Sequence, residues 1–351
     1  MTELARLIAA RIAATGPITL AAYMAECLLH PDHGYYTTRD PFGAAGDFTT
    51  APEISQMFGE LLGLSLAQAW LDQGAPAHFT LAEFGPGRGT LMADVLRATQ
   101  AVPGFHMGAS VVLLEASPAL RAAQVARLAP HRVRHIDSPD ALPDQPLFLL
   151  ANEFFDALPI HQFQFDGTAW RERLVGLRDG QMAFGLSDPI HRSFDAPAFQ
   201  NPVPGRVAEV CPAAQPYAGV IKNRIQAHGG AALIVDYGGW RSGGDTFQAM
   251  RAHSFADPLA EPGLADLTAH VDFEALASLC TLPHAYTEQG AFLKHLGIDA
   301  RATRLAQSLT GAALESHLAA HRRLTHPQEM GSLFKVLGLH GPGTPPPPGF
   351  T

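Results

Sequence analysis

The 351-residue sequence has little cysteine and no cysteine or histidine pattern of a metal site. Its three cysteines, Cys27, Cys211 and Cys280, are far apart and form no C-x-x-C pair. This spacing argues against a disulfide framework and against a cysteine zinc site, and it favours a reducing compartment. The 17 histidines are scattered along the chain, so we expect no metal.

Charge is also scarce, since Asp, Glu, Lys and Arg make up only 16% of the chain and the formal net charge is −9. The absence of a long Lys/Arg run argues against a nucleic-acid partner. No stretch approaches the roughly 20 apolar residues of a transmembrane helix, so we expect no membrane insertion. The start of the chain lacks a secretion signal and resembles a structural helix more than a transit peptide, which favours a bacterial, cytoplasmic protein.

The first part of the chain has the patterns of helices. Apolar residues at helical spacing predict two short helices before residue 30. Thr50 and Glu53 have the spacing of a capping box, which predicts a helix from there to about Asp72. Residues 1–75 are therefore expected to form a helical N-terminal arm.

Short, continuous apolar runs follow, and they alternate with helical patterns. Such runs are typical of strands buried on both faces, as in a parallel sheet covered by helices. The sequence therefore predicts a doubly wound, mostly parallel α/β fold, with residues 76–160 and 205–240 as its core. The runs are Phe79–Phe84, Val111–Glu115, Val133–Ile136, Leu147–Ala151 and Ala231–Tyr237.

The remaining segments are expected to surround this core. Alternating patterns within residues 161–204 predict an antiparallel strand insertion. Residues 241–330 are expected to form a lid and helical substrate region, because the connection that begins it is rich in Gly, Pro and His and is unusually long. Residues 331–340 are expected to add a final edge strand, and residues 341–351, with four consecutive prolines, to form a disordered tail.

A glycine-rich segment, Glu83–Thr90, follows the first apolar run and opens a helix. Glycine lets the backbone turn sharply and approach a ligand where a Cβ atom would collide. The spacing of Gly85, Gly87 and Gly89 differs from that of the dinucleotide fingerprint G-x-G-x-x-G. Without a pyrophosphate to neutralise, the helix N-terminus can face a carboxylate, while Glu83 lies near a cationic group. This pattern favours S-adenosyl-L-methionine as the cofactor, with a plain strand–helix turn as the alternative.

Four further residues are assigned to the cofactor. Glu115 ends the second run, where doubly wound nucleoside-binding folds place an acid that accepts the ribose hydroxyls. Asp137 follows the third run and is assigned to the adenine ring, with a polar loop residue as the alternative. Asn152 follows the fourth run. Asp47 is expected to close over the cofactor if the N-terminal arm folds onto the sheet.

Two acids, Glu153 and Asp156, follow the fourth run, at the carboxyl end of a central strand where open α/β sheets bind ligands. Methyl transfer is an in-line displacement, so the protein has to align the acceptor with the sulfonium. Paired carboxylates suit a guanidinium, which stays protonated and presents a planar fork of donors. We therefore predict that Glu153 and Asp156 are catalytic and accept a proton. A helix N-cap is the alternative.

The sequence resembles the MidA-like methyltransferases, a family that includes the mitochondrial complex I assembly factor that methylates arginine. The resemblance runs from Gly16 to Lys335 and is most specific over Gly46–Glu60, Glu83–Leu91, Asn152–Pro159 and Ala265–Phe273. It implies a class I methyltransferase core that binds S-adenosyl-L-methionine through the three glycines. It further implies a protein-arginine acceptor, a respiratory complex subunit in mitochondrial members, and a mitochondrial matrix protein if the chain is eukaryotic.

Other functions stay open on the sequence. A cofactor-binding assembly factor could act mainly by holding a partner subunit, and a methyltransferase could act on a small molecule. A nicotinamide-dependent oxidoreductase would need the other glycine spacing. The oligomeric state, homo-oligomers included, is also open.

Overall fold

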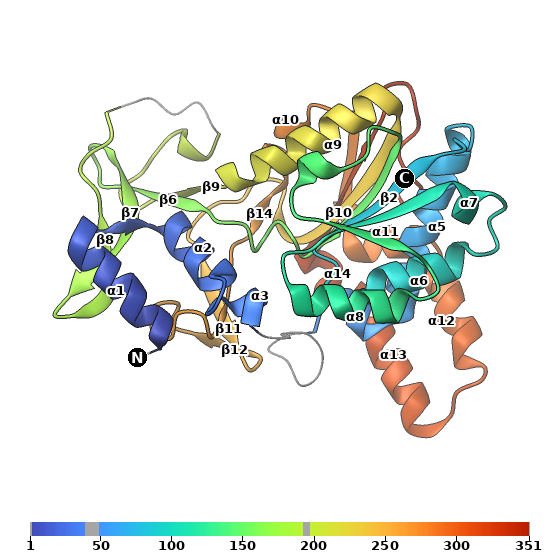
Figure 1. The fold of residues 1–351 in the computed structure, drawn as a ribbon, viewed down its shortest axis with the longest axis horizontal. Coiled ribbons are helices and arrows are strands. Elements are labelled where there is room, and N and C mark those ends of the chain that lie inside the picture. The colour runs from blue at the N-terminus through green and yellow to red at the C-terminus, as the bar shows by residue number, and fades with distance from the viewer. Residues whose placement is uncertain (1, 39–48, 192–196, 351) are drawn as a thin grey trace. The chain divides into compact units, whose positions relative to one another are not determined.

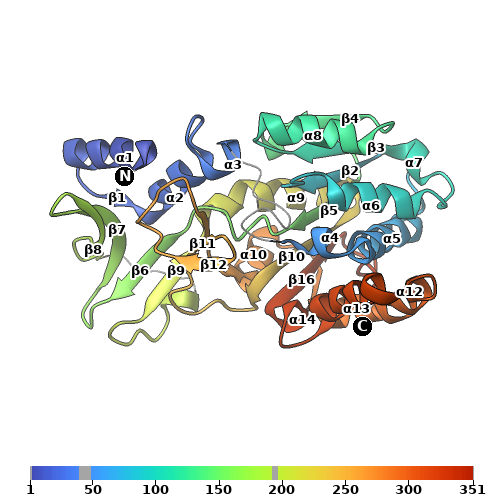
Figure 2. The same ribbon diagram turned by 90° about the horizontal axis from the view of Figure 1, so that it is seen from below.

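The computed structural model describes residues 2–38, 49–191 and 197–350. The chain folds as a mixed α/β protein that divides into two compact units, each made of separated segments (Figures 1 and 2). Unit 1 consists of Met1–Phe48, Phe155–Gln215 and Gly239–Asp272, and unit 2 consists of Thr49–Phe154, Pro216–Gly238 and Phe273–Thr351. Within the described ranges, no helix is both long and apolar enough to cross a bilayer.

Unit 2 is built on a twisted sheet whose strands follow the order β15-β16-β10-β5-β2-β3-β4. The strands from β10 to β4 run parallel, and β16 is antiparallel to both of its neighbours. These strands are β2 (Phe79–Phe84), β3 (Ala109–Leu114), β4 (Val133–Ile136), β5 (Leu147–Asn152), β10 (Gly230–Gly239), β15 (His284–Glu288) and β16 (Phe334–His340). The five continuous apolar runs thus form the parallel strands, and the predicted doubly wound α/β fold is confirmed.

The last strand is not the edge strand that the sequence predicts. Strand β16 pairs with β10 on one side and with β15 on the other, so β15 forms that edge of the sheet. The sequence gives little sign of β15, because His284–Glu288 is polar and only partly buried. An apolar pattern identifies strands that are covered on both faces and misses a half-exposed edge.

Helices cover both faces of this sheet, with α9 along one face and α5 and α6 on the other (Figure 1). Helices α5 and α6 approach closely, since a Cβ added at Gly59 would lie 2.6 Å from the Cβ of Asp94, and one at Gly63 2.9 Å from the Cα of Val95. The helices are α4 (Ala51–Ile54), α5 (Gln56–Asp72), α6 (Thr90–Thr99), α7 (Phe105–Gly108), α8 (Pro118–Leu128), α9 (Gln215–His228), α10 (Phe273–Cys280), α11 (Gln289–His295), α12 (Ile298–Ala306), α13 (Gly311–Thr325) and α14 (Met330–Leu333).

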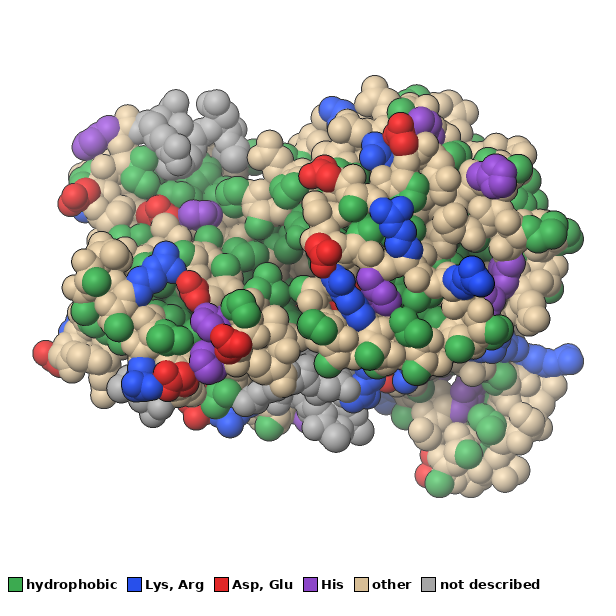
Figure 3. Space-filling view, viewed as in Figure 1, with side chains coloured by type: hydrophobic (Ala, Val, Ile, Leu, Met, Phe, Trp, Pro, Cys, Tyr) green, Lys and Arg blue, Asp and Glu red, His purple; other side chains and the backbone are tan. Residues whose placement is uncertain are grey.

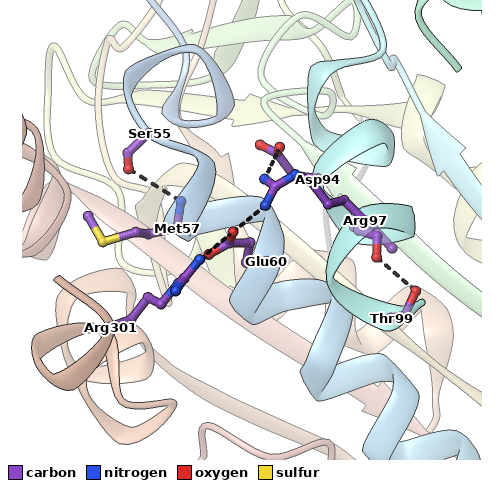
Figure 4. A network of polar contacts seen from close by, with 8 residues as sticks. Ser55, Met57, Glu60, Asp94, Arg97, Thr99 and Arg301 are labelled. Atoms are coloured by element: carbon purple, nitrogen blue, oxygen red, sulfur yellow. Dashed lines mark hydrogen bonds and ion pairs between the residues drawn. The ribbon is translucent and has the colours of Figure 1, made fainter. Parts of the chain in front are cut away.

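A buried ion-pair network joins three of these helices (Figure 4). The carboxylate of Glu60 on α5 accepts two hydrogen bonds from Arg301 on α12, at 2.8 and 2.9 Å. It also pairs with Arg97 on α6, which reaches Asp94 at 2.6 Å. The side chain of Glu60 is only 6% exposed, so both arginines neutralise an acid that is almost removed from water.

The capping box predicted for Thr50 and Glu53 is wrong. Thr50 makes no side-chain capping bond to the described residues, and the helix that was predicted to continue to Asp72 is interrupted at Ser55. The Ser55 hydroxyl caps α5 by accepting a hydrogen bond from the Met57 amide at 3.3 Å. The carboxylate of Glu53 accepts a hydrogen bond from the hydroxyl of Thr90 on α6.

Unit 1 combines short helices with an antiparallel sheet, which contains strands from the predicted insertion and also β9 from residues 205–240, which the sequence analysis assigned to the core. The sheet has the order β1-β7-β6-β9, and β8 also pairs with β7, off this path. The elements are α1 (Glu3–Thr15), α2 (Leu20–Leu29), α3 (Tyr35–Thr38), β1 (Ile18–Thr19), β6 (His161–Phe165), β7 (Trp170–Arg178), β8 (Gln181–Leu186) and β9 (Val207–Val210). The two helices predicted before residue 30 are confirmed as α1 and α2.

The long connection that was expected to be a lid folds as part of unit 1. It forms a sheet of order β12-β11-β13, from β11 (Gln248–Arg251), β12 (Ser254–Ala256) and β13 (Asp266–Thr268), and short β14 (Val271–Asp272) follows. Ala249 and Leu267 are buried in one apolar core with Leu4 of α1 and Tyr23 of α2. Its Gly and Pro content therefore reflects tight turns between short strands rather than an open loop.

The tail is ordered, which corrects the prediction of a disordered segment over 341–351 for the part that the structure describes. The ring of Phe350 packs on Phe292, with centroids 5.0 Å apart. The Ser65 hydroxyl donates to the carbonyl oxygen of Pro348 at 2.6 Å. One aromatic anchor fixes the segment, and proline restricts the freedom that the tail loses on packing.

Candidate functional site

The glycine-rich loop joins β2 to α6 at the carboxyl edge of the parallel sheet. Gly85, Gly87 and Gly89 have φ angles of +63°, +51° and +77°, which other residues adopt at a cost. A Cβ added at Gly85 would lie 2.9 Å from Cδ2 of Phe154. A Cβ added at Gly89 would lie 3.3 Å from Cγ of Gln124. Glycine is therefore required at these positions both by the left-handed backbone and by the close packing of Phe154 and Gln124 against the loop.

Glu83, just before this loop, is a buried acid with an unsatisfied oxygen. Its side chain is 2% exposed, and Oε2 has no hydrogen-bond partner among the described residues. Burial raises the pKa of Glu83 to about 8, against a hydrogen bond from the Met92 backbone that lowers it, and nearby Glu115 raises it further. A buried carboxyl without a countercharge is a common feature of sites that receive a cation.

Glu115 follows β3 at the same edge of the sheet. Its Oε1 accepts from the Ser117 amide at 2.8 Å and its Oε2 from the Gln124 side chain at 3.1 Å. Burial raises the pKa of this carboxyl, and those two hydrogen bonds oppose the shift. Each carboxylate oxygen can accept a second hydrogen bond, so Glu115 keeps capacity for a ligand hydroxyl.

Asp137 follows β4 and lies on the surface. Its side chain is 87% exposed and pairs with Arg121 of α8. Arg121 also donates to the carbonyl oxygen of Glu115, so one guanidinium joins the ends of β3 and β4. This arrangement fits both the predicted adenine contact and the alternative of a polar loop residue.

Asn152 and Glu153 end β5, next to β2 in the sheet. Oε1 of Glu153 accepts from Nδ2 of Asn152 at 3.0 Å and from the Ala51 amide at 3.2 Å. Oδ1 of Asn152 is buried without a hydrogen-bond partner in the described part of the chain. The φ angle of Glu153 is +51°, a strained value for a residue with a side chain. Strain and an unsatisfied amide oxygen at one strand end are typical of a ligand site.

Helix α4 is held against this edge from two sides. Glu53 accepts a hydrogen bond from the hydroxyl of Thr90, the first residue of α6, and the Ala51 amide binds Glu153. The segment that begins at Thr49 therefore lies beside the glycine loop. Asp47, also predicted to contact the cofactor, lies outside the described residues.

Asp156 belongs to unit 1 and lies in a buried acidic cluster there. It is 6% exposed, and its carbonyl oxygen accepts from the Ala269 amide at 3.0 Å. The Tyr36 hydroxyl donates to Oδ1 of Asp266 at 2.8 Å. Burial raises the pKa of Tyr36, and the charges of Asp266 and Asp156 raise it further. Two residues, Phe154 and Phe155, separate Asp156 from Glu153, so the three Cα–Cα steps between them span at most about 11 Å.

The carboxyl edge thus carries most of the predicted residues, together with one that the sequence analysis missed. Asp236 lies on β10 one position beyond Val235, which is paired with Asn152 of β5. It is fully buried, and its Oδ1 accepts from the Tyr237 amide at 3.0 Å. The available signal was an acid near the carboxyl end of an apolar run, a position that Asp236 in Ala231–Tyr237 shares with Glu115 in Val111–Glu115.

Comparison with known proteins gives a consistent result. Residues 61–290 match the model of a family described as S-adenosyl-L-methionine-dependent methyltransferases. The Drosophila melanogaster protein arginine methyltransferase NDUFAF7 homolog, mitochondrial, is 37% identical over 96% of this chain and 84% of its own length. The Homo sapiens protein arginine methyltransferase NDUFAF7, mitochondrial, is 37% identical over 97% of this chain and 83% of its own.

A solved structure agrees with this match. A superfamily member from Burkholderia thailandensis, bound to S-adenosyl-homocysteine, is 32% identical and superposes with a TM-score of 0.84. The alignment covers 96% of this chain and 91% of the other. The similarity therefore extends over both units.

Proposed function

Because this chain belongs to the family of S-adenosyl-L-methionine-dependent methyltransferases and has their class I fold, we propose that it methylates an arginine of a protein acceptor. The observation that best supports this proposal is the environment of the Glu83 side chain. Its buried, unpartnered Oε2 stands at the start of a loop with three glycines in the left-handed region. A cationic ligand bound at this loop would supply the positive charge that the Glu83 carboxylate lacks, and the backbone of the glycine loop, which carries no side chains at three positions, would allow it to approach closely.

We assign cofactor contacts to residues at the sheet edge. Gly85, Gly87 and Gly89 form the backbone cradle, and Glu83 faces the cationic methionyl half. Glu115 accepts the ribose hydroxyls, Asp137 lies at the adenine, and Asn152 offers its unsatisfied Oδ1. When bound, S-adenosyl-L-methionine supplies an electrophilic methyl group on a positively charged sulfur. The chain aligns the acceptor with it and excludes water.

Asp156 is the better catalytic candidate of the two predicted acids. It lies with Asp266 and Tyr36 in a buried cluster that suits a guanidinium, which binds carboxylates through planar pairs of N–H donors. In this role Asp156 holds the acceptor nitrogen and takes the proton that leaves it. Glu153 is a positioning residue, because its Oε1 already holds Ala51 and Asn152.

The finer identity of the acceptor rests on resemblance. The curated relatives are named mitochondrial protein arginine methyltransferases. With the family resemblance noted in the sequence, this supports a respiratory complex subunit as the acceptor. The chain would then act in the mitochondrial matrix, or in the cytoplasm of a bacterium.

The test is transfer of a labelled methyl group from S-adenosyl-L-methionine to proteins of a lysate, followed by mapping of the labelled residue. We expect the label on arginine, and we expect Asp156→Asn to remove it while S-adenosylhomocysteine still binds. Asp32→Asn, at an exposed acid of unit 1, is the matched control. Label on a small molecule, or full activity in Asp156→Asn, would contradict the proposal.

A further inference from the structure

Unit 1 contains a cleft of about 520 Å³ that none of the assignments above uses. One wall is a face of the antiparallel sheet, and the other comes from the segment that carries β11–β13. The residues lining it are Gln164, Arg173, Phe184, Gly185, Leu186, Asp245, Phe247 and Pro258. Its lining combines the polar side chains of Gln164, Arg173 and Asp245 with apolar and aromatic ones, so the cleft offers both kinds of contact to a ligand.

The charged side chains of this cleft, Arg173 and Asp245, form an ion pair with no net charge. Nη1 of Arg173 donates to both carboxylate oxygens of Asp245, each at 2.8 Å, and to Oε1 of Gln162 at 2.8 Å. Within the described residues, the other nitrogens of Arg173 and the Gln164 amide have no hydrogen-bond partner. Because Asp245 neutralises Arg173, a phosphate or free carboxylate would meet a repelling charge. The remaining N–H donors of Arg173, together with the Gln164 amide and the Asp245 carboxylate, can instead bind the C=O and N–H groups of a peptide.

Strand β8 gives this cleft an open edge. Among the described strands, it pairs only with β7, in a register that places Gly185 opposite Leu174. The Ser187 amide donates to the carbonyl oxygen of Glu172 at 2.8 Å, which identifies the residues of β8 that bond to β7. Since bonding alternates along an antiparallel strand, Gly185 faces β7, and the backbone groups of residues 182, 184 and 186 face outward.

The outward groups lie beside the cleft. Phe184 and Leu186 line it with their side chains and present their N–H and C=O groups at the open edge. A Cβ added at Gly185 would meet no atom within 4 Å, so the face of β8 opposite to the side chains of Phe184 and Leu186 is also open at this residue. An exposed strand edge with a flanking pocket is the arrangement by which domains bind an extended peptide.

On the face shown in Figure 3, Lys and Arg side chains are interspersed with Asp and Glu side chains. The local ion pair of Arg173 with Asp245 repeats this balance inside the cleft.

We propose that an extended segment of the protein acceptor docks on unit 1 as a strand added to β8, with an apolar side chain in the cleft and peptide groups bound by Gln164 and Arg173. This inference rests on the proposed function, in that it takes the acceptor to be a protein. Main-chain pairing supplies affinity that does not depend on sequence, and the cleft selects the side chain. The docking surface is separate from the residues assigned to the cofactor.

The test uses random 12-residue peptides displayed on phage, selected on the full chain with S-adenosylhomocysteine present. Leu186→Pro removes an outward N–H donor without removing a bond to β7, and Leu186→Ala is the matched control that keeps the donor. We expect a selected peptide to bind Leu186→Pro about tenfold more weakly, the effect of one lost hydrogen bond, and to bind Leu186→Ala within about threefold. Gln164→Leu should weaken binding similarly, and it tests the site even if the proline variant fails to fold.

Amide exchange by NMR gives a readout at single residues. On peptide binding, the amides of Phe184 and Leu186 should become protected, whereas that of Gly185 is already protected by β7. Failure to select a peptide, or binding insensitive to both variants, would overturn the docking site. A dimer of this chain that Leu186→Pro dissociates would also overturn it, since a second copy would then occupy the edge.

The outcomes separate this inference from the proposed function. Arginine labelling in a lysate that is unaffected by Leu186→Pro and Gln164→Leu would remove the docking site alone. Peptide binding at β8 in a chain that transfers no methyl group would remove the proposed activity and leave the peptide site standing.

Discussion

The side-chain amide of Gln124 donates a hydrogen bond of 2.6 Å to the carbonyl oxygen of Gly87. The same nitrogen donates to Oε2 of Glu115 at 3.1 Å, and Oε1 of Gln124 lies 2.8 Å from Nε2 of His135. Two acceptors on one side fix the orientation of the amide, so His135 must carry its proton on Nε2. One fully buried residue of α8 therefore couples the glycine loop to the acid after β3.

Gln124→Leu should weaken cofactor binding. The change leaves the Gly87 carbonyl and Glu115 without their donor, at a cost of about 1–3 kcal/mol in the free energy of unfolding. We expect calorimetry to give a dissociation constant for S-adenosylhomocysteine at least several-fold higher. Gln68→Leu, which removes an exposed amide bonded to Asp72, is the control and should change neither quantity appreciably. Unchanged affinity in Gln124→Leu would show that the loop holds its shape unaided.

Glu83→Gln should stabilise the protein without cofactor. The pKa of Glu83 rises from 4.5 to about 8 on folding, so the folded state binds more protons than the unfolded state between these values. Stability is therefore lost as pH rises from about 4.5 to 8, by up to about 3 kcal/mol at pH 7. The isosteric amide removes that dependence. Urea unfolding of the wild type and of Glu83→Gln between pH 5 and 8 measures how the free energy of unfolding depends on pH. The same pH dependence in both proteins would contradict the prediction.

The same variant should bind the cofactor worse. Cation binding requires the ionised carboxylate, so affinity in the wild type should rise between pH 6 and 8 and binding at pH 7 should release a proton. Calorimetry in buffers of different ionisation enthalpy detects that proton. The ligand's own titration affects the wild type and Glu83→Gln equally, so the difference between their affinities at each pH reports on Glu83. If affinity depends on pH in the same way in both proteins, Glu83 does not bind the cation.

Gly85→Ala should lower the free energy of unfolding by more than the backbone angle of residue 85 alone explains. At φ +63° any Cβ carries a penalty of about 1 kcal/mol, and here it would also lie 2.9 Å from the ring of Phe154. Gly180→Ala is the matched control, because its φ is +78° and an added Cβ meets nothing within 4 Å. We expect Gly85→Ala alone to reduce affinity for S-adenosylhomocysteine. Equal losses of stability and equal affinities in the two variants would contradict the cradle.

Glu60→Gln should destabilise the packing of α5, α6 and α12 by about 1–2 kcal/mol, because Arg301 and Arg97 lose a charged acceptor while water still reaches both guanidinium groups. Burial alone would raise the pKa of Glu60, but hydrogen bonds from Arg301 and Arg97 outweigh it and hold the pKa below 4.5. The ionised form therefore stabilises the fold above pH 4.5, and that contribution is lost as pH falls through the lowered pKa. The free energy of unfolding of the variant should fall less steeply with decreasing pH than that of the wild type. An equal decrease in both proteins would count against this prediction.

The parallel core could be predicted from the sequence because its strands are buried on both faces. All six residues of β2 and of β5 are buried, and continuous apolar runs report such burial directly. The carboxyl edge followed from topology, since residues after parallel strands meet at one side of a sheet. This reasoning placed Glu83 and Glu115 beside the glycine loop before any contact was known.

The parts that could not be predicted depend on contacts between distant residues. Glu53 looked like half of a capping box, but its partner is Thr90, which lies in another helix. Strand β15 is held by pairing with β16 rather than by its own apolar pattern. The tail is ordered by Phe350 on Phe292, although its prolines alone indicate an extended segment. Local patterns do not record such tertiary partners.

The position of β16 bears on how the chain can be made. This strand is synthesised last among those of the large sheet, yet it lies inside the sheet, between β10 and β15. Until residues 334–340 emerge from the ribosome, the apolar strand β10 has an unpaired edge and β15 has no strand to pair with, a state prone to aggregation. Stop codons shortly before this strand should therefore yield insoluble protein rather than a shortened enzyme.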